Sequence, residues 1–184
     1  MSTIKKFLNL IFIDGLSGMA LGLFSTLIIG TILKQAADLI GGDFGYYLGV
    51  FAVMAQRLTG AGIGIGVAYK YKSSTYVTLS AAAAGMIGAY ATAIISGSIL
   101  SDGALVYSGP GDPLSAFIAA LAGIAVGSLP AGKTKLDLLI TPAVTIIAGG
   151  AVGIIVGPPV STIMTRLGDI INWGTVRSEE RRVG

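Results

Sequence analysis

The residues best suited to chemistry in this chain are the few polar side chains that interrupt long apolar runs. Gln56 and Arg57 lie in the middle of one apolar segment, and Asp14 lies near the start of an earlier one. A charge at the centre of a membrane-spanning helix costs about 2.5–3.5 kcal/mol on insertion scales, so it faces protein or water and marks a pathway by default. These three side chains are therefore candidates for contacting a polar solute within a membrane.

Two interpretations of Arg57 follow from its surroundings. The stretch Thr59–Gly62 could break the helix and leave residues 63–69 as a half-helix, whose positive end would favour an anion beside Arg57. Alternatively, Arg57 forms a structural ion pair with Asp14, or residues 56–61 are a loop that joins two short elements. Replacing Arg57 with Met separates a ligand site from a purely structural role.

Asp112 is a candidate of a different kind, because it lies in the Gly/Pro-rich loop Tyr107–Pro113. Asp is a good N-cap and Pro113 suits the first helical position, so capping chemistry predicts a helix over residues 114–130. The same loop could fold back and line a translocation path, with Asp112 offering its carboxylate to substrate hydroxyls.

Further along, Gly157-Pro158-Pro159 predicts a kink or an end of the last helix.

The composition excludes several kinds of chemistry. The chain has no cysteine and no histidine, so it has no disulfide, no thiolate metal site and no phosphohistidine of its own. We therefore expect no catalytic residue, no metal site and no cofactor. The net charge of +3 is spread over loops and forms no stripe typical of nucleic-acid binding.

One sequence motif matches a phosphate-binding pattern, but the elements expected around it do not suit phosphate binding. The segment Gly127–Thr134 matches the phosphate-loop pattern G-x-x-x-x-G-K-[ST] letter for letter. The pattern binds phosphate only where a strand precedes it and a helix follows within a parallel sheet. An apolar membrane helix precedes it here, so we interpret the segment as a cytoplasmic turn that carries the topology-setting Lys133 and Lys135.

The elements that must position these residues are membrane helices. Hydrophobic residues make up 53% of the chain, charged residues 11%, and the mean hydropathy is +0.83, whereas a soluble domain has roughly 25% charged residues. The sequence predicts an all-α, polytopic transmembrane helix bundle with Gly/Pro-broken segments and about five spans, at residues 8–33, 48–69, 76–100, 114–130 and 138–164.

Charges in the loops predict the topology. Lysines cluster on every second loop, in the pairs Lys5/Lys6, Lys70/Lys72 and Lys133/Lys135. Because positively charged loops stay in the cytoplasm, we expect a cytoplasmic N-terminus.

Glycine, at 28 residues, predicts how the spans pack. Pairs four residues apart, such as Gly18/Gly22, Gly60/Gly64 and Gly149/Gly153, lie on one helix face. Small residues at this spacing let helix backbones approach closely. The same faces would allow a homodimer, although the sequence does not require one.

The length of 184 residues leaves room for one membrane domain, which we assign to residues 1–176. Residues 177–184 differ, with five charges in eight positions. They resemble a translated sequencing-adapter stretch, which predicts a non-native tail on a chain cut near Val176. The alternative is a native juxtamembrane tail of mixed charge.

Several blocks together resemble a known family, the second enzyme IIC family of the bacterial phosphotransferase system, which includes membrane proteins once described as perfringolysin regulators. These blocks are Ser17–Phe24, Gly111-Asp112-Pro113, Ala131–Lys135 and Gly157-Pro158-Pro159. The resemblance runs from about residue 8 to Trp173. Members are nearly twice as long as this chain.

The resemblance implies a bacterial cytoplasmic-membrane permease that binds and translocates a small polar solute, with sugars as the main class. A separate IIB-type component would donate the phosphoryl group, so the phosphorylated residue would lie on that partner, and members commonly dimerise. The alternative is a membrane sensor or regulator that keeps the transporter fold without phosphoryl transfer. The binding candidates are Arg57, Gln56, Asp14 and Asp112, with lipid as the surrounding medium.

Overall fold

A computed structural model describes residues 9–133 and 135–180 of the chain, and within them the fold is all-α apart from one short β-hairpin. Lys5, Lys6, Thr134 and the end of the tail at 181–184 lie outside the described residues. The elements are η1 (Leu10–Gly15), α2 (Leu16–Leu23), η2 (Phe24–Ile28), α3 (Ile29–Ile40), α4 (Gly42–Arg57), α5 (Thr59–Lys70), α6 (Thr75–Ala89), α7 (Ala91–Ile95), β1 (Leu100–Ser101), β2 (Ala104–Leu105), α8 (Pro113–Gly127) and α9 (Asp137–Glu180).

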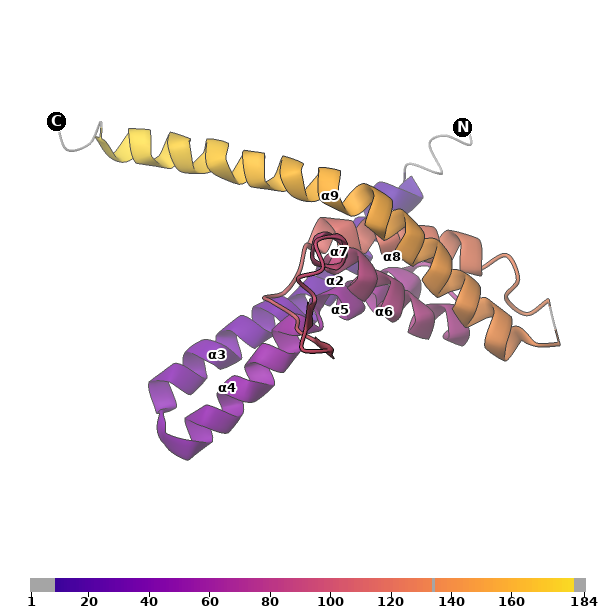
Figure 1. Cartoon of the computed structure of the whole chain (residues 1–184), viewed down its shortest axis with the longest axis horizontal. Helices are drawn as coiled ribbons and strands as arrows, with labels where there is room; N and C mark the ends of the chain where they lie inside the picture. The colour runs from indigo at the N-terminus through magenta and orange to yellow at the C-terminus, as the bar shows by residue number, and fades with distance from the viewer. Residues whose placement is uncertain (1–8, 134, 181–184) are drawn as a thin grey trace.

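The first four helical elements form one continuous helix, in which η1 and η2 are π-helical stretches. It ends at Gly41 and Gly42, whose φ angles of 66° and 60° are left-handed and therefore favour glycine. The chain then turns back as α4. Figure 1 shows α3 and α4 as a hairpin that projects from the rest of the molecule.

The remaining helices α5, α6 and α8 pack with the first half of α9 into a bundle. Its core is formed by buried apolar side chains, among them Ile63 and Val67 of α5, Val77 of α6, and Phe117 and Ile124 of α8. The N-terminal helix covers this bundle through the contact between α2 and α5.

Glycines form the closest helix contacts, as the four-residue spacing predicts. A Cβ atom added to Gly18 would lie 2.6 Å from the carbonyl oxygen of Gly66, and one added to Gly64 would lie 2.0 Å from the carbonyl oxygen of Ala81. These distances leave no room for a side chain at either position. The predicted tight packing of the bundle is therefore confirmed.

The prediction of about five spans is not confirmed. In the part of the chain that the structure describes, two helices can cross a membrane by length and composition, Ile11–Ile40 and Asp137–Ile171. The bent pair α4 and α5 makes a third if counted as one span. Within the described residues, the expected spans at 76–100 and 114–130 are the shorter helices α6 and α8. At 1.5 Å per residue, each of these 15-residue helices is only about 22 Å long.

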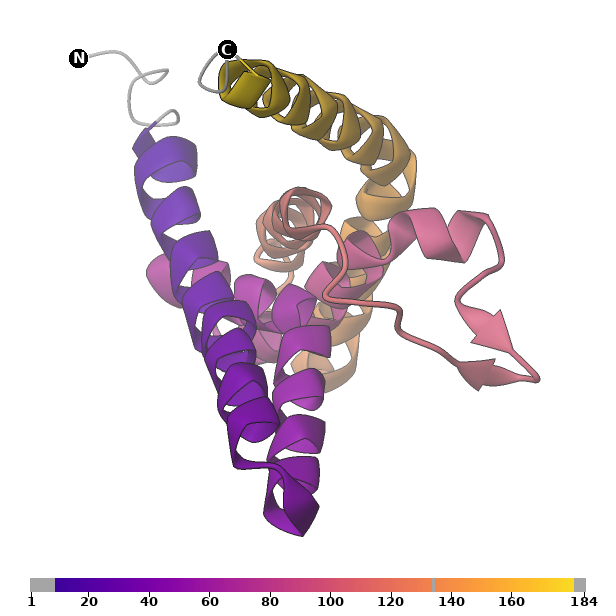
Figure 2. The same cartoon turned by 90° about the vertical axis from the view of Figure 1, so that its left-hand side faces the viewer.

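The expected third span fails because its apolar run changes structure partway. The chain leaves α6 at Tyr90, makes the short α7, and then forms a β-hairpin in which Leu100 pairs with Leu105. Asp102 and Gly103, with φ angles of 51° and 78°, form the turn, an Asp-Gly pair suited to a two-residue hairpin loop. Figure 2 shows this hairpin extending away from the helices before the chain returns to α8.

The last helix also differs from expectation. Residues 138–164 were predicted as one span, but α9 continues to Glu180 with Pro142, Pro158 and Pro159 inside it. The predicted kink at Gly157-Pro158-Pro159 coincides with the region where α9 changes direction in Figure 1. The helix therefore bends there and does not end.

The outer surface of the molecule is apolar. Exposed fractions reach 88% for Leu39, 68% for Phe44 and 72% for Ile155, and many other large apolar side chains are also exposed. A soluble monomer rarely exposes contiguous apolar surface on this scale. Lipid is the medium that such a surface suits, in agreement with the membrane class predicted from composition.

Candidate functional site

The helix break at Leu58 positions Arg57 and Gln56. The N–H of Leu58 is shared between the carbonyl oxygens of Met54 and Ala55, both 3.2 Å away, and the axes of α4 and α5 then differ by 54°. The fully buried Thr59 donates its hydroxyl hydrogen to the carbonyl oxygen of Gln56 at 2.6 Å, which satisfies a group that the break would leave unpaired. The break predicted at Thr59–Gly62 therefore occurs at Leu58, and the half-helix is the whole of α5.

Gln56 joins the break to the N-terminal helix. Its side-chain amide donates to the Thr31 hydroxyl oxygen at 3.2 Å, and its Cγ atom would lie 2.7 Å from a Cβ atom at Gly30. The absence of a side chain at Gly30 thus lets Gln56 lie against α3. Gln56 is half-buried and Arg57 is exposed.

Arg57 lines a cavity of about 690 Å³ between α3 and α4. The charged Lys34 and Asp38, which form an ion pair with each other, also line it. The remaining lining is formed by small and apolar residues and one tyrosine: Ala37, Gly41, Gly42, Gly45, Tyr46, Gly49, Val50, Val53 and Met54. The Arg57 guanidinium therefore borders an open space that could hold a small molecule.

Tyr90 links the break in α4 and α5 to the loop before α8. Its hydroxyl lies 2.7 Å from the carbonyl oxygen of Gly109 and 3.2 Å from that of Arg57, so its hydrogen can be donated to either. Its ring packs against that of Tyr107, with 4.9 Å between the centroids. Tyr90 itself lies at the break between α6 and α7, so three interruptions of helical structure meet at this side chain.

Asp112 has the predicted capping role. It caps α8, because its carboxylate accepts the Leu114 N–H at 3.0 Å and the Ser115 hydroxyl at 2.6 Å, and Pro113 is the first helical residue. Its own N–H donates to the carbonyl oxygen of Ala89 at 2.8 Å, so the loop does fold back onto the end of α6. The capping prediction is confirmed, while the lining role stays a prediction.

The kink in α9 belongs to the same region. The Ser115 hydroxyl, besides donating to Asp112, lies 3.4 Å from the carbonyl oxygen of Gly157. Proline residues that follow Gly157 lack the N–H that would pair with an earlier helical carbonyl. The side chain of Ser115 thus connects the start of α8 with the position where α9 bends.

Asp14 lies apart from this group. The N-terminal helix runs antiparallel to α5, since Gly18 meets Gly66 and the Thr26 hydroxyl lies 3.4 Å from that of Thr59. Asp14 is consequently near the far end of α5, beside Tyr71. Burial raises the pKa of the Tyr71 phenol, and the Asp14 carboxylate raises that pKa further.

The separation rules out the ion pair between Asp14 and Arg57. Since α5 has 12 residues, its two ends are about 18 Å apart. Among the described residues the ion pair is Lys34–Asp38, and Asp14 and Arg57 do not pair. The hypothesis of a structural Asp14–Arg57 pair is therefore wrong.

The sequence analysis missed Tyr90. Its signal was a tyrosine in the middle of the apolar run of α6 and α7, since a buried tyrosine hydroxyl needs a partner. The partner could not be identified from the sequence, because Gly109 and Arg57 lie 19 and 33 residues away.

Replacing Tyr90 with Phe is expected to lower the free energy of unfolding by about 0.5–1.5 kcal/mol, because the half-buried hydrogen bond to the carbonyl of the exposed Gly109 would be lost. Reversible unfolding in mixed micelles, followed by circular dichroism, measures the change. The matched control is Tyr69→Phe, since Tyr69 is 70% exposed. Equal stabilities of the two variants would show that the Tyr90 hydroxyl does not hold these segments together.

Broken helices and close glycine contacts, in a bundle with an apolar outer surface, are typical of a polytopic membrane protein. The family model described as "Phosphotransferase system, EIIC" matches residues 13–178. The chain belongs to this family, as the sequence blocks indicated, and is thus a membrane permease component of the phosphotransferase type. No significant match was found among curated proteins or solved structures.

Proposed function

We propose that this chain binds a small polar solute, a sugar, and carries it across the bacterial cytoplasmic membrane. Family membership supports the permease class. The main support for a solute path is the position of Arg57. This residue lies at the break between α4 and α5 and lines a cavity of about 690 Å³. A charge retained at a helix break in a membrane is typical of a translocation site.

The side chains at the break suit hydroxyl groups. The Arg57 guanidinium offers five N–H donors and the Gln56 amide offers both donors and an acceptor, which together match the mixed character of sugar hydroxyls. The start of α5 adds the partial positive charge of a helix N-terminus. In this proposal Arg57 and Gln56 contact the solute directly.

Asp112 and Asp14 have other roles in this proposal. The Asp112 carboxylate already accepts two hydrogen bonds, so it acts by holding the folded-back loop against α6. Asp14 lies beside Tyr71, near the end of the bundle that carries Lys70 and Lys72. It would meet the solute only at that end of the path.

The phosphoryl donor in this proposal is a separate IIB component in the cytoplasm. The chain has no histidine or cysteine that could carry the phosphoryl group. Loops 70–74 and 128–136 lie at the same end of α6 and α8 and hold four lysines, so we assign this end to the cytoplasm. The N-terminus is then cytoplasmic as well, because η1 lies beside Tyr71.

Uptake of radiolabelled sugars in bacterial cells that express the chain with a IIB component tests the proposal. We expect accumulation of at least one sugar that requires phosphoenolpyruvate and the general phosphotransfer proteins. Binding of a sugar to the purified chain without accumulation would contradict transport and would instead match a membrane sensor.

A further inference from the structure

A second cavity, of about 700 Å³, lies at the opposite end of the bundle from Asp112. Its floor is one face of α8, formed by Ile118, Leu121, Ala122 and Ala125. Ile11 of η1 and Val152 of α9 form its apolar walls. Within the described residues, neither the solute path nor the capping network uses this space, and its volume is in the range of ligand pockets.

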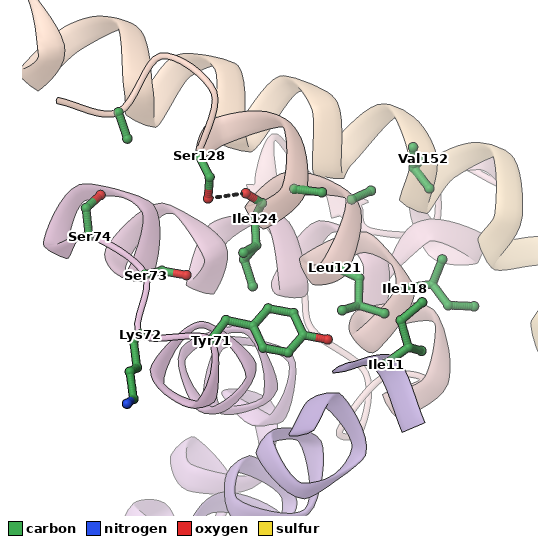
Figure 3. Close-up of a pocket in the computed structure, with 13 residues that line it drawn as sticks. Ile11, Tyr71, Lys72, Ser73, Ser74, Ile118, Leu121, Ile124, Ser128 and Val152 are labelled. Atoms are coloured by element: carbon green, nitrogen blue, oxygen red, sulfur yellow. Dashed lines mark hydrogen bonds between the residues drawn. The ribbon is translucent and has the colours of Figure 1, made fainter. Parts of the chain in front are cut away.

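The serines and the lysine of this cavity are gathered at one end. Figure 3 shows Ser73, Ser74 and Lys72 at that end, with the Lys72 side chain directed outward, and Ile11, Ile118 and Val152 at the other end. The Tyr71 ring lies across the cavity, with its hydroxyl toward Leu121 and Ile11. Ser128 also belongs to the lining, with its hydroxyl donated to the carbonyl oxygen of Ile124. The cavity is therefore amphipathic along its length, with an apolar trough that leads to a polar rim.

The rim has an excess of positive charge. Loops 70–74 and 128–136 flank it and contribute Lys70, Lys72, Lys133 and Lys135, all of them exposed. Two acidic residues reduce this charge without cancelling it: Asp137, which accepts a hydrogen bond from Thr141, and Asp14, which lies in η1 with Ile11, at the apolar end. Four lysines against these two carboxylates leave a net positive charge.

The backbone at Lys72 is a second, independent observation. Lys72 has a φ angle of 52°, its N–H donates to the carbonyl oxygen of Tyr69, and the N–H of Ser73 donates to that of Ala68. These bonds define a Schellman motif, whose left-handed position favours glycine. A lysine therefore occupies a position that the backbone alone would assign to glycine, at the rim of the cavity.

We propose that this cavity binds an anionic phospholipid of the cytoplasmic leaflet, with an acyl chain in the α8 trough and the phosphate at the Lys72 rim. The apolar floor excludes a purely ionic ligand, and the lysines select a negative headgroup over a zwitterionic one. Basic pockets between membrane helices on the cytoplasmic side bind anionic headgroups in this way. The proposal is independent of the solute path, since the cavity does not include Arg57 or Gln56.

Lipid titration of the full chain in detergent micelles tests the proposal. Bound dioleoylphosphatidylglycerol and dioleoylphosphatidylcholine are counted by native mass spectrometry, with melting temperatures recorded in parallel. We expect phosphatidylglycerol to bind at least fivefold more tightly, from about 1 kcal/mol per lysine near the headgroup. Equal binding of the two lipids would overturn the proposal. So would an equal rise in melting temperature with soluble glycerol phosphate.

Three variants locate the site. Lys72→Gly keeps the Schellman geometry and should reduce the preference for phosphatidylglycerol about fivefold. Ala125→Trp fills the trough and should weaken both lipids, with Ala122→Phe as the replacement if the Trp variant does not fold. Arg166→Gln, which removes an exposed charge from α9 outside the cavity, should change nothing. Full lipid preference in Lys72→Gly, or full binding in the trough-filled variants, would contradict the assigned site.

Discussion

Replacing Arg57 with Met is expected to reduce phosphoenolpyruvate-dependent sugar uptake by at least tenfold while leaving helical content unchanged. A hydrogen bond to a charged group contributes about 1.5–3 kcal/mol, which corresponds to a factor of about 10 to 150 in affinity. Folding should persist because the guanidinium is exposed and is not paired with Asp14. The Tyr90 hydroxyl contacts the backbone carbonyl of Arg57, which the substitution keeps.

Uptake assays with matched expression levels measure this effect, together with circular dichroism and size-exclusion elution of the purified variants. The control is Arg166→Met, which removes an exposed arginine from α9 outside the cavity. If Arg57→Met kept its fold and transported as well as the unmodified chain, Arg57 would not be a solute ligand.

Replacing Gly64 with Ala should cause the largest loss of stability in the bundle. The added Cβ atom would lie 2.0 Å from the carbonyl oxygen of Ala81, so the backbones of α5 and α6 would have to move apart. Overpacking of this kind typically costs about 1–3 kcal/mol and occasionally more, and contact with a rigid backbone belongs to the upper part of that range. We expect a loss of about 3 kcal/mol in the free energy of unfolding.

Gly168→Ala provides the matched control, because its added Cβ atom would meet nothing within 4 Å. Ala there should stabilise α9 by about 0.5–1 kcal/mol, since glycine is a poor helix former. Unfolding of both variants in mixed micelles gives the comparison. A Gly64→Ala variant as stable as Gly168→Ala would mean that α5 and α6 do not pack in the described way.

The features that follow from local chemistry could be predicted from the sequence. Asp112 and Pro113 indicated the start of α8 within one residue, because capping depends on neighbouring atoms. Glycine pairs indicated close helix contacts, since lipid leaves few other ways to pack helices. The stretch Thr59–Gly62 indicated a possible helix break, and the break lies just before it, at Leu58.

The features that depend on distant parts of the chain could not be predicted. Apolar composition continues from α6 through the hairpin at Leu100–Leu105, so hydropathy could not show where the helix ends. Hydropathy also gave five spans where, among the described residues, two helices, or three with the bent pair, are long enough to cross a membrane. Likewise, the charges of Asp14 and Arg57 suggested a pair, but the antiparallel run of α2 along α5 separates them.

The helix interruptions form one connected group. Tyr90 contacts the carbonyls of Arg57 and Gly109, the Asp112 N–H contacts the end of α6, and Ser115 links Asp112 to Gly157. In a membrane, non-helical backbone is tolerated only where protein covers it or where it lines a water-filled space. Within this group, Arg57 is the residue that also lines the cavity between α3 and α4.

Thiol labelling tests most directly whether that cavity is a water-accessible solute path, and a chain without cysteine is a clean background for it. Met54→Cys places a thiol in the cavity lining, and Leu79→Cys places one on an exposed apolar position of α6. With a charged, membrane-impermeant thiol reagent, the account predicts that Met54→Cys reacts, that the transported sugar slows the reaction, and that Leu79→Cys stays unlabelled. A Met54→Cys thiol as unreactive as that of Leu79→Cys would contradict it.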